Sequence, residues 1–74
     1  MFIKVTRVYI LRDVSPEKRD HYVNVKNIVH MWSLNYRGHT VTEICFHNRE
    51  HFIHVTETPE IILKMIQEAG IDHD

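Results

Sequence analysis

The chain contains little of several residue types on which common protein classes depend. It has one cysteine, two glycines and two prolines in 74 residues. A single cysteine excludes an intramolecular disulfide framework and is typical of a reducing compartment, so we expect a cytoplasmic protein. Two glycines are too few for a glycine-rich loop that cradles phosphates, which argues against nucleotide hydrolysis.

An excess of one charge and a long hydrophobic run are also missing. Nine basic and ten acidic residues give a formal net charge of -1, which offers no general attraction to a phosphate backbone and disfavours nucleic-acid binding. No apolar run approaches the roughly 20 residues of a membrane-spanning helix, and residues 1–5 lack the layout of a secretory signal. We therefore expect no membrane insertion.

What is present is a regular alternation of apolar and polar residues near the middle of the chain. It predicts strands over residues 40–47 and 51–57. A two-residue turn at 48–49 and a four-residue loop at 47–50 are equally compatible with the pattern, and both leave the same pairing parity. The two strands are therefore predicted to form an antiparallel hairpin.

The parity of this hairpin predicts which side chains are buried. Ile44 lies opposite Ile53, and Phe46 and Val55 share their face, which we assign to the core. The opposite face then carries Glu43, Cys45, His47, Glu50, Phe52 and His54.

A capped amphipathic helix is predicted over residues 59–69. Thr58 supplies a capping hydroxyl, Pro59 suits the first helical position, Glu60 complements the helix dipole, and Gly70 is expected to end the helix. The apolar stripe consists of Ile61, Ile62, Met65, Ile66 and Ala69. We expect this stripe to cover the sheet, with a partner-binding helix as the alternative.

Two earlier segments complete the predicted sheet. Residues 2–11 have strand composition, residues 12–21 form a charged segment that we interpret as a loop, and residues 22–32 resemble a strand with a bend. The turn at 33–39 then leads into the hairpin. The whole chain, residues 1–74, is thus predicted to be a single α+β domain: a four-stranded antiparallel meander, curled towards an SH3-like half-barrel, with one C-terminal helix on one face.

This succession resembles the small flagellar FlbD (SwrD) family over most of the chain. The resemblance is carried by Ile3-Lys4-Val5-Thr6-Arg7, Tyr22-Val23-Asn24 with Ile28 and Met31, Thr42 to Asn48, Val55-Thr56-Glu57-Thr58, and Ile61 to Ile66. It implies a small non-enzymatic accessory protein that acts through contacts with larger bacterial or phage-encoded machinery. The loop at 12–21 is longer than the family's first turn, and Asn48-Arg49 stands where the family has Asn-Gly. No functional residue is carried over.

Seven histidines and one thiol are the remaining candidates for chemistry. Cys45, His47 and His54 could supply zinc-ligand atoms, but their spacing on a hairpin matches no recognised zinc motif, and solvent-facing histidines beside a partly buried thiol are favoured. Cys45 as a nucleophile would require His47 or His54 as its base, and no oxyanion loop accompanies them. We expect neither a cofactor nor enzymatic activity.

Our leading hypothesis is a non-catalytic interaction or regulatory module. One helix covers only one face of a sheet, so an apolar residue on the other face favours association with a protein partner or a second copy. The predicted contact residues are Phe52, Cys45 and His54, assisted by Trp32, Tyr36 and Arg37. For Trp32 the alternative is a plug at the end of the core. The alternative functions are a nucleic-acid-binding regulator that uses Trp32, Tyr36 and Arg37, and a metal-binding domain.

Overall fold

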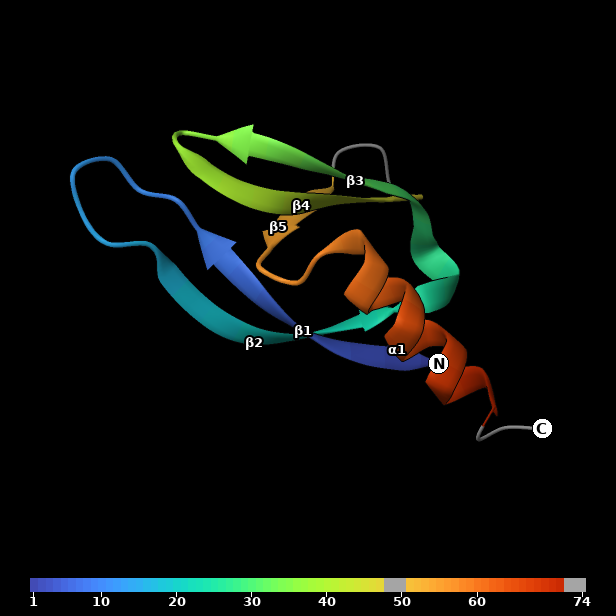
Figure 1. Ribbon diagram of the computed structural model, residues 1–74. Coiled ribbons are helices and arrows are strands. Elements are labelled where there is room, and N and C mark those ends of the chain that lie inside the picture. The colour runs from blue at the N-terminus through green and yellow to red at the C-terminus, as the bar shows by residue number, and fades with distance from the viewer. Residues whose placement is uncertain (48–50, 72–74) are drawn as a thin grey trace.

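A single antiparallel sheet, in the strand order β2-β1-β5-β4-β3, supports one C-terminal helix (Figure 1). The computed structural model describes residues 1–47 and 51–71. Its elements are β1 (Phe2–Tyr9), β2 (Glu17–Asn24), the short 3-10 helix η1 (Val25–Asn27), β3 (Ile28–Tyr36), β4 (His39–Phe46), β5 (Phe52–Val55) and α1 (Pro59–Ile71). The α+β class is as predicted, and the predicted turn at 48–49 lies outside the described residues.

The described residues form five strands, so the prediction of four is wrong. The expected bent strand at 22–32 is two strands separated by η1, whose first turn is capped where the Asn24 side chain accepts a hydrogen bond from the Lys26 N–H at 3.1 Å. The expected loop at 12–21 is also shorter, because β2 begins at Glu17 and pairs with β1 along its whole length. A charged strand is tolerated there because β2 is an edge strand and its charged residues 17–20 are all exposed.

The predicted meander is wrong as well, because β5 pairs with β1. Arg7 lies opposite Val55, which places the first and last strands side by side and leaves β2 and β3 at the two edges of the described sheet. The hairpin register is as expected: Ile44 lies opposite Ile53, and the Phe46 N–H donates to the His51 carbonyl oxygen at 3.3 Å.

The main core lies between the sheet and α1. It consists of Ile3, Val5, Val23, Ile44, Ile53, Val55 and Ile62, with Met31, Phe46, Met65 and Ile66 packed against it. The helix packs against β1 and β3, and Figure 1 shows it lying across the side of the sheet between these strands. The helix therefore joins two parts of the sheet that are far apart in strand order, which confirms that its apolar stripe covers the sheet.

The N-cap of α1 is as predicted, whereas the burial of Ile61 and the end of the helix are not. The Ile61 N–H donates to Thr58 Oγ1 at 3.2 Å, so the N-cap is as expected. Ile61 itself is 50% exposed, however. The buried stripe is centred on Ile62, and consecutive residues of an α-helix are rotated by about 100° around its axis, so Ile61 lies beside the stripe. The helix also continues through Gly70 to Ile71, so Gly70 does not end it.

A second, smaller core lies at the other end of β1. It contains Val8, Ile10 and Val41, with Leu34 and Tyr36 packed against it. β1 itself ends at Tyr9, and Leu11 is half-exposed, so the predicted strand at 2–11 is slightly too long. Within the described part of the chain no helix has the length and apolar character needed to cross a bilayer.

Candidate interaction surface

Two rows of side chains cross β3, β4 and β5 on the face opposite α1. Trp32 lies opposite Glu43, which lies opposite His54 on its other side. The second row is formed in the same way by His30, Cys45 and Phe52. These residues alternate along their strands with Met31, Ile44 and Ile53 of the core, so they point away from it.

Aromatic rings occupy the outside of this surface. His30 and Trp32 are stacked, with ring centroids 4.7 Å apart, and Phe52 packs at 5.5 Å from the His54 ring. Tyr36, farther along β3, also lies against His54, with ring centroids 4.8 Å apart. We call this set of seven residues the aromatic patch: His30, Trp32, Tyr36, Glu43, Cys45, Phe52 and His54.

The centre of the aromatic patch is polar and mostly buried. His54 Nε2 lies 3.0 Å from Glu43 Oε1, and the two side chains are only 12% and 18% exposed. Trp32 and Phe52 around them are 48% and 53% exposed. The patch is therefore an apolar surface supported by a hydrogen-bonded pair, an arrangement that holds the neighbouring rings in place.

The Cys45 thiol belongs to the same network. Its Sγ lies 3.9 Å from Glu43 Oε2, to which it can donate a hydrogen bond. Burial raises the pKa of Cys45, and the charge of Glu43 raises it further. The thiol is therefore held in its protonated form, which is the weakly nucleophilic form.

A cavity of about 390 Å³ adjoins the patch where β4 ends and β5 begins. Val29, Cys45, His47, His51 and Phe52 are among its lining residues. His47 thus lies near Cys45, as the sequence predicts. No group of three or more potential metal ligands occurs within residues 1–47 and 51–71, so the described residues do not assemble the zinc set of Cys45, His47 and His54.

Five of the six predicted contact residues meet in the patch. Arg37 does not: it lies in the β3–β4 turn, where its Nη1 donates to the Ile10 carbonyl oxygen at 3.3 Å while its guanidinium lies 5.2 Å from the Tyr36 ring. The predicted cluster of Trp32, Tyr36 and Arg37 is thus divided. Arg37 lies beside Tyr36 at the turn, whereas Trp32 stacks on His30. Trp32 is half-exposed and does not plug the core.

Sequence reasoning missed two members of the patch. The sequence pattern places Glu43 on the correct face but gives it no role, although its spacing of two residues from Cys45, which puts both on one face, is a usable signal. His30 was missed because a strand predicted to end at residue 32 was not resolved into faces, and β3 contains an irregularity in register between Ile28 and His30. Such irregularities arise from tertiary pairing.

The edge strand beside the patch has an unusual composition. β3 contains no aspartate, glutamate, lysine or arginine, and it contains neither glycine nor proline. The other edge strand, β2, begins with the four consecutive charged residues at 17–20. Charges on an edge prevent pairing with other chains, and β3 lacks this protection.

Comparisons with protein-family models, curated proteins and solved structures found no match to this chain.

Proposed function

We propose that this protein is a small non-catalytic interaction module that binds another protein, or a second copy of itself, through the aromatic patch and the adjoining edge of β3. The observation that carries the proposal is the half-exposed pair Trp32 and Phe52 on a face that α1 does not cover. Large aromatic side chains in such positions contribute most of the energy in protein interfaces.

The edge of β3 supports the same surface. An extended segment of a partner can add to an unprotected edge through main-chain hydrogen bonds, while side-chain contacts with Trp32 and His30 provide selectivity. β3 also has no fixed charge that would repel a second β3 in antiparallel pairing. The charged segment of β2 makes the opposite edge a poor alternative.

A non-catalytic role agrees with the chemistry of the patch. Cys45 and His54 each interact with the Glu43 carboxylate. A carboxylate beside a thiol disfavours the thiolate, whereas nucleophilic cysteines depend on positive surroundings.

For the class of partner, we propose larger bacterial or phage-encoded machinery, which the resemblance to the flagellar family suggests. We also propose that the sheet is a form of SH3-like half-barrel, since β1 pairs with both β2 and β5 while η1 separates β2 from β3.

The test compares two aspartate substitutions. Trp32→Asp lies in the patch, whereas Tyr22→Asp places the same charge on the exposed surface of β2. Light scattering after size exclusion, from micromolar to millimolar concentration, measures self-association, and affinity capture from the native cell measures binding of other proteins. We expect Trp32→Asp to reduce complex formation at least tenfold and Tyr22→Asp to leave it unchanged. Equal complex formation by both variants and the wild type would exclude the patch as the binding surface.

A further inference from the structure

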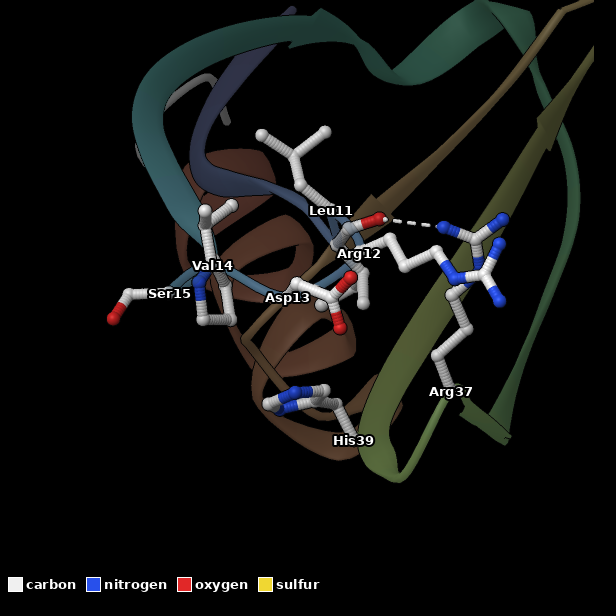
Figure 2. Close-up of a pocket in the computed structure, with 9 residues that line it drawn as sticks. Leu11, Arg12, Asp13, Val14, Ser15, Arg37 and His39 are labelled. Carbon is white, nitrogen blue, oxygen red and sulfur yellow. Dashed lines mark hydrogen bonds between the residues drawn. The ribbon is translucent and has the colours of Figure 1, made fainter.

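A pocket separate from the aromatic patch lies where the β1–β2 loop approaches the β3–β4 turn (Figure 2). Its volume is about 950 Å³, and it is lined by residues 10–16 together with Arg37 and His39. This volume is typical of sites that hold small organic molecules, which range from about 300 to 1,000 Å³. None of the residues of the aromatic patch lines it.

Two arginines from distant parts of the chain line this pocket together. Figure 2 shows the guanidinium groups of Arg12 and Arg37 directed to the same side of the pocket. The hydrogen bond from Arg37 Nη1 to the Ile10 carbonyl oxygen, at 3.3 Å, fixes one of them against the β1–β2 loop. Neither arginine takes part in any ion pair formed among residues 1–47 and 51–71. Two like charges in one pocket favour an anion between them.

The other polar groups of the pocket suit an oxyanion. The His39 ring is a further donor among the lining residues, the Ser15 hydroxyl is directed away from the two guanidinium groups (Figure 2), and Asp13 is the single lining carboxylate. Arginine is well matched to phosphate because its planar fork can donate two parallel hydrogen bonds. The pocket therefore offers the donors of two arginines on one side and a single opposing carboxylate.

The backbone at the pocket adopts costly conformations. Asp13 has φ 65° and Arg37 has φ 51°, and these are the non-glycine residues with positive φ in the described part of the chain. Arg37 precedes Gly38, which has φ 83°, in the two-residue turn between Tyr36 and His39, and such a turn requires positive φ at both central residues. The hairpin turn therefore accounts for the conformation of Arg37, whereas the positive φ of Asp13 lies in the loop that lines the pocket.

Apolar side chains form the remaining wall. Ile10 is buried at its base, while Leu11 and Val14 are exposed at its rim. A site with both donors and apolar walls suits a molecule that has an anionic group and an organic part.

We propose that this pocket binds the phosphate group of a small phosphorylated organic molecule, with Arg12 and Arg37 as anion ligands and Leu11 and Val14 against the organic part. A nucleic-acid strand fits less well, because the chain has a formal net charge of -1 and two of the cations of β1 and β2 are paired with carboxylates. Arg19 Nη2 lies 2.8 Å from a Glu17 oxygen, and Lys4 Nζ lies 3.4 Å from an Asp20 oxygen. A polyanion would require a continuous row of unpaired cations.

The experiment is titration of the isotopically labelled full chain with phenyl phosphate, inorganic phosphate and benzoate, followed by amide chemical shifts. We expect saturable shifts confined to residues 10–16 and 37–39, tightest for phenyl phosphate, weaker for inorganic phosphate and at least tenfold weaker for benzoate. Arg12→Gln should weaken phenyl phosphate binding at least tenfold, and so should Arg37→Lys, which keeps the charge but loses the planar fork.

Arg19→Gln is the matched control, since it removes the same charge from outside the pocket. The dispersion of the amide spectrum shows whether each variant is folded, and Arg12 forms no hydrogen bond within the described residues whose loss would disturb the turn. Three results would overturn the proposal: no saturable shift with phenyl phosphate, equal weakening by Arg12→Gln and Arg19→Gln, or tighter binding of a short oligonucleotide with shifts spread beyond the pocket.

Discussion

The Glu57 carboxylate accepts hydrogen bonds from both the backbone N–H and the hydroxyl of Thr6, 51 residues earlier in the chain. The N–H lies 2.8 and 3.1 Å from the two carboxylate oxygens, and the hydroxyl lies 2.9 Å from one of them. The Glu57 carbonyl oxygen in turn accepts from the Thr42 hydroxyl at 2.6 Å. One residue between β5 and α1 thus connects β1 and β4 to the start of the helix.

We expect Glu57→Gln to lower the free energy of unfolding by about 1–3 kcal/mol, because the amide can accept on only one of its two atoms and leaves a donor of Thr6 poorly paired. Chemical denaturation measures the effect. Glu60→Gln, in the exposed first turn of α1, is the control and should change stability by less than about 1 kcal/mol. A similar loss in both variants would show that the Glu57 contacts contribute nothing specific.

Two neighbouring isoleucines test the packing of α1. Ile62 is fully buried in the main core, whereas Ile61 is half-exposed. We expect Ile62→Ala to destabilise the fold by about 2–5 kcal/mol because it leaves a cavity in the core. Ile61→Ala should have a much smaller effect. Thermal unfolding of the two variants would contradict the helix placement if Ile61→Ala proved the more damaging substitution.

The raised pKa of Cys45 predicts slow alkylation at neutral pH. Burial is the main cause and the charge of Glu43 the second, so Glu43→Gln should lower the pKa of Cys45 and move the alkylation rate profile to lower pH. The rate with iodoacetamide, measured as a function of pH, tests this. Glu68→Gln, on the exposed side of α1, should leave the profile where it is. An unchanged profile in Glu43→Gln would show that the carboxylate does not influence the thiol.

The same pKa predicts how stability depends on pH. The folded state keeps the thiol protonated, while the unfolded chain releases this proton near the ordinary value of 9.0. The contribution of the protonated Cys45 thiol to the free energy of unfolding is therefore fully present below pH 9. It is lost as the pH rises through the pKa of Cys45 in the folded state. Chemical denaturation measures this effect: in this pH range the free energy of unfolding of the wild type should fall more steeply than that of Cys45→Ser. Parallel curves for the two proteins would contradict the prediction.

A lysine on the uncharged edge tests the role of β3. We expect Ser33→Lys to reduce complex formation without unfolding the chain, because a charged side chain on an edge disfavours pairing with another strand. Tyr22→Lys, on the edge strand β2, should have no effect. Light scattering and affinity capture report on both. Complexes that tolerate Ser33→Lys would limit the interface to the aromatic face.

The local parts of this protein were determined by its sequence alone. Alternation of apolar residues was sufficient to place Ile44 opposite Ile53, since a strand has a period of two and one face must be buried. Thr58 was sufficient for the start of the helix because its hydroxyl satisfies an N–H within the same turn. Both depend only on neighbours along the chain.

Tertiary structure decided the order of the strands and the contents of both sites. The charged β2 forms a strand because β1 provides its partner, and β5 pairs with β1 where Val5 and Val55 share the main core with Ile62. The approach of Arg37 to Arg12, and of Tyr36 to His54, follows from that order. Local preferences carry no information about such pairs, since the free energy that brings them together comes from burying the shared core.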